Sequence, residues 1–144
     1  AVINFWHFLA KLEAKGFRKI VDVQEAAGEL GLSPDTPLLG YVFKEGWAKT
    51  NRSSVRGLYD ASREAKSILA TDDKAWENLR VIMKSKSQKE FIALRDAWRD
   101  GVPGQKIDFS SAEAMFVFMK QYGEGKLIKK DSFLDAGAFF AVNK

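Results

Sequence analysis

The sequence has no cysteine, and it contains only three prolines and one histidine among its 144 residues. The absence of cysteine excludes disulfide bonds and thiolate metal sites, and it leaves the redox compartment open. No apolar run approaches the roughly 18 to 20 residues that a membrane-spanning helix needs. No basic start followed by an apolar core marks a signal peptide. A globular domain with an ordinary apolar core is therefore the expected class.

One-sided charge is also missing. The 23 basic residues are interleaved with 19 acidic ones, and the formal net charge is +4. Binding to nucleic acid needs a basic face, and only the segment Lys126–Lys130 resembles one. Nucleic acid is therefore not expected as a partner, and a solvated lysine-rich surface is the simpler interpretation. Apolar residues make up 46% of the chain, which excludes a disordered tail.

The first part of the chain has a mixed pattern. Phe5, Leu9 and Leu12 recur at helical spacing, with Asn4 as the expected N-cap and Gly16 just after the end. The segments 17–23 ("FRKIVDV") and 38–43 ("LLGYVF") are rich in β-branched and aromatic residues and predict two strands. With a strand end at residues 1–3, this is a clipped βαβ unit. The expected fold class is therefore α/β and helix-rich, with a parallel sheet.

Beyond Glu45 every segment has a helical pattern. Two capping boxes support this, because Ser87 precedes Glu90 by three residues and Ser110 precedes Glu113 by the same interval. The apolar stripes predict at least four helices and no strand of more than a few residues between 46 and 144. Their members are Val55, Leu58, Tyr59, Leu69, Trp76, Leu79, Met83, Phe91, Leu94 and Trp98.

Few residues are candidates for chemistry. His7 has no second histidine or cysteine at metal-binding spacing and no matched nucleophile, so neither a metal site nor catalysis is expected there. Asp72 and Asp73 stand at the start of a helix, where carboxylates cap backbone N–H groups. Trp76 and Trp98 fall in apolar stripes and are expected in the core. No cofactor or catalytic residue is assigned.

Trp6 and His7 differ because they occupy the first turn of a helix that is expected to follow a strand. In open α/β sheets ligands bind at that edge, and free N–H groups of a helix start favour anions. Two interpretations stay open for this pair. The residues either contact a ligand, or they pack the helix on its sheet together with Phe5 and Phe8.

Over most of its length the chain resembles a known family. The segments "NFWHFLAKLEAKGFRKIVDV" and "LGLSPDTPLLGYVFKEGWAKTNRSSVRGLYDASREAKSILATDDKAWENLR" are similar to the C-terminal half of periplasmic substrate-binding proteins of ABC importers, in the nitrate, sulfonate and taurine group. The order and spacing of segments carry the resemblance. Its matched positions are Trp6, 37–43, 47–51 and 61–66.

The resemblance implies a two-lobed periplasmic-binding-protein type II fold, of which this chain would be a fragment. Residues 1–37 would be the remainder of the second lobe, 38–44 a hinge strand, and 45–144 the helical part of the first lobe. The implied function is solute binding outside the cytoplasm, with a small anion such as a sulfonate or nitrate as ligand and an inner-membrane permease as partner. The ligand-binding residues would be Asn4, Trp6, His7, Gly40 and Tyr41.

Two alternatives and one further prediction accompany this hypothesis. A biosynthetic enzyme on the same fold, similar to pyrimidine-precursor synthases, is disfavoured because the cysteine expected in its chemistry is absent. A stand-alone helical interaction module is the other class of function. Finally, a clipped sheet would expose a strand edge, which predicts self-association of the chain.

Overall fold

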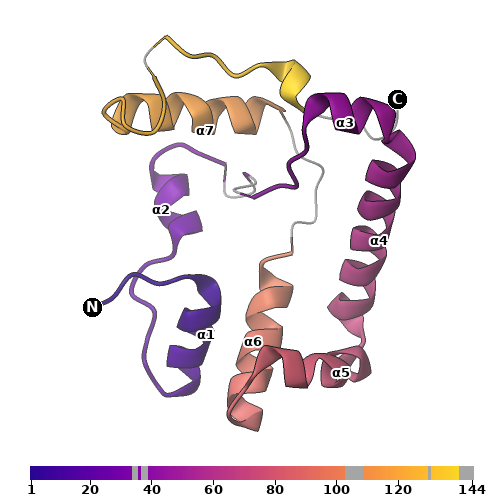
Figure 1. Cartoon of the computed structure of the whole chain (residues 1–144). Helices are drawn as coiled ribbons and strands as arrows, with labels where there is room; N and C mark the ends of the chain where they lie inside the picture. The colour runs from indigo at the N-terminus through magenta and orange to yellow at the C-terminus, as the bar shows by residue number, and fades with distance from the viewer. Residues whose placement is uncertain (34–35, 37–38, 103–108, 130, 140–144) are drawn as a thin grey trace. The chain divides into compact units, whose positions relative to one another are not determined.

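This computed structural model describes residues 1–33, 36, 39–102, 109–129 and 131–139. Helices account for all regular structure in these residues. Figure 1 shows their order along the chain. They are α1 (Trp6–Ala14), α2 (Val23–Glu29), α3 (Glu45–Thr50), α4 (Arg52–Thr71), α5 (Asp73–Met83), α6 (Gln88–Asp100) and α7 (Phe109–Tyr122), followed by the short 3₁₀ helix η1 (Ala136–Ala138).

The expected α/β fold is wrong. None of the described residues forms a strand, and neither 17–22 nor 39–43 is paired in a sheet. Leu38, the first residue of the expected hinge strand, lies outside the described residues. A β-forming segment becomes a strand only when another segment accepts its backbone hydrogen bonds, and local composition cannot supply that partner. The lobe boundaries expected at residues 37 and 44 stay a prediction.

The helical expectations fared better. Residues 46–144 contain α4, α5, α6 and α7 within their described part, which confirms the prediction of at least four helices there. Helix α1 is also confirmed, but its N-cap is Phe5 and not Asn4. Its end follows the glycine signal: Gly16 adopts a φ of +92°, and the amide of Phe17 donates to the Leu12 carbonyl at 3.1 Å. This left-handed glycine closes a Schellman motif.

Helix α2 was missed. The sequence pattern placed the end of a strand at Val23 and predicted no helix after it, yet the structure forms a helix from Val23 to Glu29. Asp22 caps the helix by accepting from the amide of Gln24 at 2.8 Å, and Glu25 completes a capping box. The spacing of Asp22 and Glu25 is a sequence signal that could have found this helix.

The two predicted capping boxes have different outcomes. Ser87 caps α6 and accepts from the Glu90 amide at 3.2 Å, as expected. The Glu90 side chain, however, pairs with Lys11 of α1 at 3.4 Å. Ser110 lies inside α7, which begins at Phe109, so it does not precede that helix as a cap residue would. Gly101 and Gly123 directly follow α6 and α7.

The chain divides into two compact units. The first unit comprises Ala1–Ile20 and Leu58–Val102, and the second comprises Val21–Gly57 and Pro103–Lys144. The first unit holds α1, α5, α6 and most of α4. The second holds α2, α3, α7 and η1. Each unit is described by itself below.

The core of the first unit forms where α1 lies beside α6 (Figure 1). Ala10 of α1, Phe91 and Leu94 of α6, and Trp76 of α5 are all buried, and Phe91 is only 2% exposed. Trp76 meets Trp98 edge to face at 5.3 Å between ring centroids, and Trp98 is half-buried. The placement of both tryptophans in apolar packing confirms the sequence prediction.

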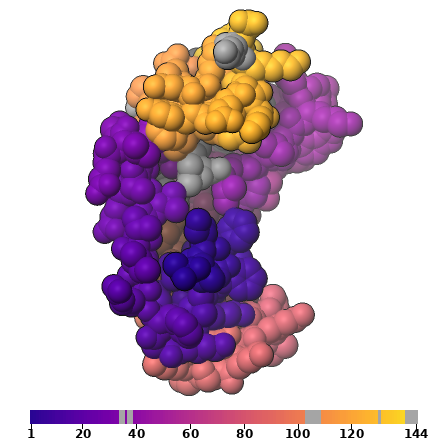
Figure 2. Space-filling view, turned by 90° about the vertical axis from the view of Figure 1, so that its left-hand side faces the viewer, coloured from indigo at the N-terminus to yellow at the C-terminus, as the bar shows by residue number. Residues whose placement is uncertain are grey.

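The second unit buries less. Its buried apolar residues among those described are Leu32, Ala48 and Val55. Helix α7 buries none of its residues, although Phe109 packs on Phe139 at 5.5 Å and Lys120 donates to the Ser132 carbonyl at 2.9 Å. The orange atoms of α7 and the yellow atoms of the segment after it accordingly form a continuous surface in Figure 2.

Candidate functional site

The start of α1 is an uncapped helix terminus. Phe5 occupies the N-cap position in an extended conformation, and its apolar side chain cannot accept a hydrogen bond from the helix. The first backbone N–H groups of a helix have no intrahelical acceptor, so those of Trp6 and His7 are directed away from the helix body. No acidic residue stands in the first turn. The combined partial positive charge of this end is therefore not offset locally, which favours an anion.

Trp6 and His7 sit at this terminus within an aromatic cluster. The His7 ring lies 4.3 Å from Phe8, 5.6 Å from Trp6 and 6.1 Å from Phe5, measured between centroids, and it is parallel to the Phe5 ring. Trp6 is 49% exposed and His7 is intermediate. Both side chains are therefore at least partly accessible. The alternative, that they pack α1 on a sheet, is wrong because no described residue forms a sheet.

The other residues of the predicted site fall elsewhere. Asn4 is exposed and precedes the N-cap, so it does not cap α1. Gly40 and Tyr41 belong to the second unit, in the segment before α3, and Tyr41 is 65% exposed. Among the five predicted site residues, the structure brings Trp6 and His7 together at one terminus. Binding by any of the five stays a prediction.

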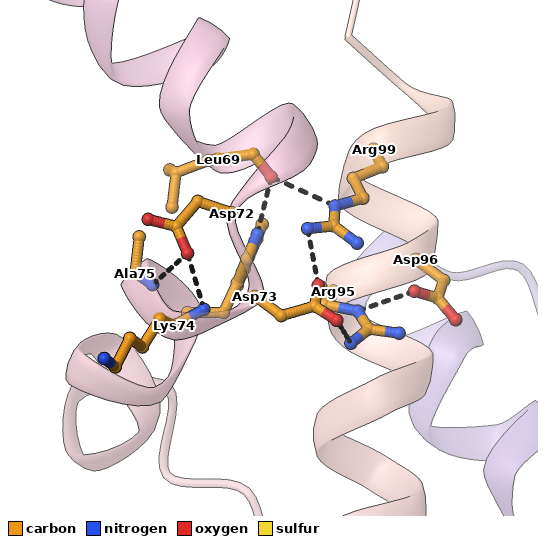
Figure 3. Close-up of polar contacts among 9 residues, drawn as sticks. Leu69, Asp72, Asp73, Lys74, Ala75, Arg95, Asp96 and Arg99 are labelled. Atoms are coloured by element: carbon orange, nitrogen blue, oxygen red, sulfur yellow. Dashed lines mark hydrogen bonds and ion pairs between the residues drawn. The ribbon is translucent and has the colours of Figure 1, made fainter.

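Sequence reasoning missed a polar cluster where α4, α5 and α6 meet (Figure 3). Asp72 caps α5, as predicted, by accepting from the amides of Lys74 and Ala75 at 2.7 and 3.2 Å. The Asp73 carboxylate is held by two arginines of α6, with Arg99 Nη2 at 2.7 Å and Arg95 Nη1 at 3.1 Å. The spacing of four between these arginines, on one helix face, is the sequence signal.

The same cluster satisfies the end of α4. The carbonyl of Leu69 accepts from Trp76 Nε1 at 2.7 Å and from Arg99 Nε at 3.0 Å (Figure 3). A carbonyl in the last turn of a helix has no intrahelical donor, so these side chains replace one. The hydrogen bond to Asp96, together with the charges of Asp96, Asp73 and Glu77, raises the pKa of Arg95 despite its partial burial. The guanidinium is therefore permanently charged, and the cluster acts as a structural clamp.

A shallow groove of about 500 Å³ runs along α7 in the second unit. It is open to solvent, and its wall opposite α7 is formed by the residues that directly follow α2. Its lining mixes apolar and polar side chains, with Glu113 as the only charged one. The lining residues are Leu30, Gly31, Leu32, Ser110, Glu113, Ala114, Val117, Phe118, Gln121 and Tyr122.

In the described residues, no group of three or more histidine, aspartate or glutamate side chains is arranged to hold a metal ion. None of the helices formed by these residues is both long enough and apolar enough to cross a membrane.

Comparison with known proteins adds no relative. No protein-family model, curated protein or solved structure matches the chain.

Proposed function

We propose that the chain is part of a non-catalytic, extracytoplasmic solute-binding component of an ABC importer, and that it contributes to binding of a small anion such as a sulfonate or nitrate. The importer class, the location and the permease partner rest on the resemblance in the sequence. The two-lobed α/β fold is not part of this proposal, because the described residues are helical.

One observation carries the binding proposal. Exposed Trp6 and half-buried His7 lie side by side at the start of α1, where no side chain caps the backbone and no acidic residue neutralises it. An oxyanion at this point accepts from the free N–H groups and from the imidazole, while the indole supplies an apolar wall. Helix α1 has nine residues, which is long enough for the partial charge at its end to develop.

The test uses the single histidine. Because His7 is the only imidazole in the chain, its NMR signals need no assignment among alternatives. Titration of the whole chain with nitrate or methanesulfonate is expected to shift the signals of His7 and of the Trp6 indole N–H saturably, with chloride at equal ionic strength as the reference. The indole of Trp76, which is 4% exposed, is expected to stay unchanged.

A matched variant makes the test specific. Phe5→Ser places a hydroxyl at the N-cap, which accepts from the same N–H groups and competes with an anion there. This variant is expected to stabilise α1 and to weaken anion binding, whereas His7→Gln weakens binding without adding a cap. A wild-type chain without a saturable response, or variants that respond as it does, would contradict the proposal.

A helical interaction module is the second candidate. The observation in its favour is the number of large apolar side chains that stay exposed in both units, among them Ile3, Phe17, Leu39, Val42, Val81 and Phe133. Exposed apolar surface of this extent is typical of proteins that bind other chains. A null result in the anion titration combined with association in sedimentation would favour this candidate.

A further inference from the structure

The corner between α5 and α6 presents both apolar and cationic side chains to solvent. Val81 is 86% exposed and Ile82 is 75% exposed, and both lie in the last turn of α5. Three exposed lysines follow within a few residues, namely Lys84, Lys86 and Lys89. None of these lysines takes part in an ion pair or a hydrogen bond of its side chain in the part of the chain that the structure describes. The corner therefore combines exposed aliphatic surface with positive charge.

The end of α1 lies at the same place. The ion pair between Lys11 and Glu90, at 3.4 Å, joins the C-terminal half of α1 to the first turn of α6, and Figure 1 and Figure 2 show these two helix ends side by side. Lys15 and Arg18 are exposed just after α1, and Phe17 between them is 63% exposed. All of these residues belong to the first unit. Two segments far apart in the sequence thus bring cations and apolar side chains to one end of this unit.

Residues 15–18 and 81–89 together form the corner surface, and its positive charge is largely unopposed. The two segments contain five basic residues and no acidic one. Glu90, which follows directly, is buried and bound by Lys11. Glu13 is exposed close by and offsets one of the five charges. A net excess of cations therefore surrounds the exposed aliphatic pair.

The other lysine cluster of the chain, in the second unit, has a different balance of charge. Lys126 pairs with Glu124 at 3.1 Å, and Asp131 follows two residues after Lys129. Leu127 is 69% exposed between these lysines. This cluster resembles the corner surface in composition but has acidic residues interleaved with its lysines, so it provides a comparison within the same chain.

An anionic lipid surface matches both properties of the corner surface. Lysine and arginine side chains are attracted to the negative potential of such a surface, and exposed aliphatic side chains gain free energy by leaving water for the interface. Nucleic acid would also attract the cations, but its phosphate backbone offers no apolar environment to Val81 and Ile82. The exposed aliphatic pair therefore favours lipid over nucleic acid.

We propose that the corner surface docks the protein on a bilayer that contains anionic phospholipids. Val81 and Ile82 enter the headgroup region, and the lysines of the corner bind lipid phosphates around them. Binding is peripheral and reversible, because each cation contributes little and none of the helices in the described residues can cross a bilayer. The inference is independent of the proposed anion site, which lies at the opposite end of α1.

Co-sedimentation of the whole chain with vesicles tests the proposal. The wild type is expected to bind vesicles of equal parts phosphatidylglycerol and phosphatidylcholine but not vesicles of phosphatidylcholine alone, and added salt should weaken the binding. Lys84→Gln combined with Lys86→Gln is expected to lower the partition coefficient by about tenfold or more, because each lysine contributes about fivefold. Val81→Ser combined with Ile82→Ser is expected to lower it by about fivefold or more.

Lys126→Gln combined with Lys129→Gln is the matched control. It removes the same two charges from the second unit and is expected to change the partition coefficient by less than about twofold. The substituted lysines are exposed in both double variants, so circular dichroism should show the same helix content as in the wild type. Equal effects of the two double variants would show that net charge alone governs binding, and would overturn the proposal.

A fluorescent label tests insertion directly, because the absence of cysteine allows a single labelling site. Ile82→Cys carrying an environment-sensitive fluorophore is expected to shift its emission to the blue on the anionic vesicles. Phe133→Cys, at an 82% exposed position of the second unit, is expected not to shift. A wild-type chain that does not bind the anionic vesicles, or a label at residue 82 that stays in water, would overturn the proposal. Binding to a DNA duplex that Val81→Ser with Ile82→Ser leaves unchanged, without binding to vesicles, would assign the surface to nucleic acid instead.

Discussion

Helices α6 and α7 show that apolar content does not decide burial. Helix α7 is the more apolar of the two and carries a continuous run from Ala114 to Met119, yet none of its residues is buried. Helix α6 is rich in charge, yet it buries Phe91, Leu94 and even Glu90. The difference lies in arrangement. The apolar residues of α6 form one stripe that α1 and α5 cover, whereas those of α7 surround the helix and have no single partner face.

The polar contacts reinforce this contrast. Around α6 the charged side chains join different helices: Lys11 reaches Glu90, and Arg95 and Arg99 reach Asp73. Around α7 the aromatic pair Phe118–Tyr122, at 4.6 Å, lies within the helix itself, and the contacts of Phe109 and Lys120 reach the segment that follows α7 and not another long helix. Contacts between elements hold a tertiary structure together, and contacts within one element stabilise only that element. Stability should therefore be concentrated in the first unit.

The largest expected effect comes from the centre of the first unit. Phe91→Ala removes the most buried aromatic side chain of the described residues and the face on which the Arg80 guanidinium lies, 4.8 Å from the ring centroid. Such truncations typically cost about 3 to 5 kcal/mol in the free energy of unfolding. Urea denaturation followed by circular dichroism measures it. Phe133→Ala, at an 82% exposed position of the second unit, is the control and should change the free energy by less than about 0.5 kcal/mol. Equal effects would remove the contrast between the units.

The pair between α1 and α6 should have the next largest effect. Glu90 is buried with its side chain 8% exposed, and Lys11 neutralises it from α1. Lys11→Ala leaves a buried carboxylate without its cation and is expected to cost about 1 to 3 kcal/mol. A double-mutant cycle with Glu90→Ala measures the coupling, which should be clearly nonzero. Additive effects of the two substitutions would show that this contact does not join the helices.

The clamp on α5 should contribute less, because Asp73 is 66% exposed and water screens its ion pairs. Asp73→Asn is expected to cost about 1 kcal/mol or less in the free energy of unfolding. The cost should shrink at high salt, since partly exposed pairs are screened. The matched variant is Asp96→Asn, which loses the contact to Arg95 within α6 and does not join two helices. A larger effect at Asp96 would contradict the importance of contacts between helices.

The smallest expected effect concerns two strained positions, one in each unit. Lys84 ends α5 at a φ of 49°, and Glu124 follows α7 at a φ of 51°. Glycine relieves the strain of a left-handed residue at a partial cost in backbone entropy, so Lys84→Gly should stabilise by about 0.5 to 1 kcal/mol. Glu124→Gly, in the second unit, should change the thermal midpoint of the first unit by less than Lys84→Gly does. If both raise the midpoint equally, the two units unfold together.

Local signals in the sequence located most helices and their ends. Ser87, Asp72 and Gly16 act within a few residues of the chain, and each does in the structure what its position predicts. The candidate site was predicted in part for the same reason, because the first turn of α1 is a local feature. Its link to Gly40 and Tyr41 depended on the expected fold and stays a prediction.

The sequence by itself determined most of the helices, the caps at Asp72 and Ser87, the end of α1 at Gly16, and which stripe of α6 is apolar. Only the tertiary structure decided whether residues 17–22 and 39–43 become strands. It also decided that the Glu90 side chain pairs with Lys11 instead of with the N-cap of its own helix. The same holds for Asp73, which Arg95 and Arg99 of another helix bind. The physical reason is the range of the interactions. A helix makes its hydrogen bonds within itself, whereas a strand or a salt bridge between helices depends on a partner that the local sequence does not specify.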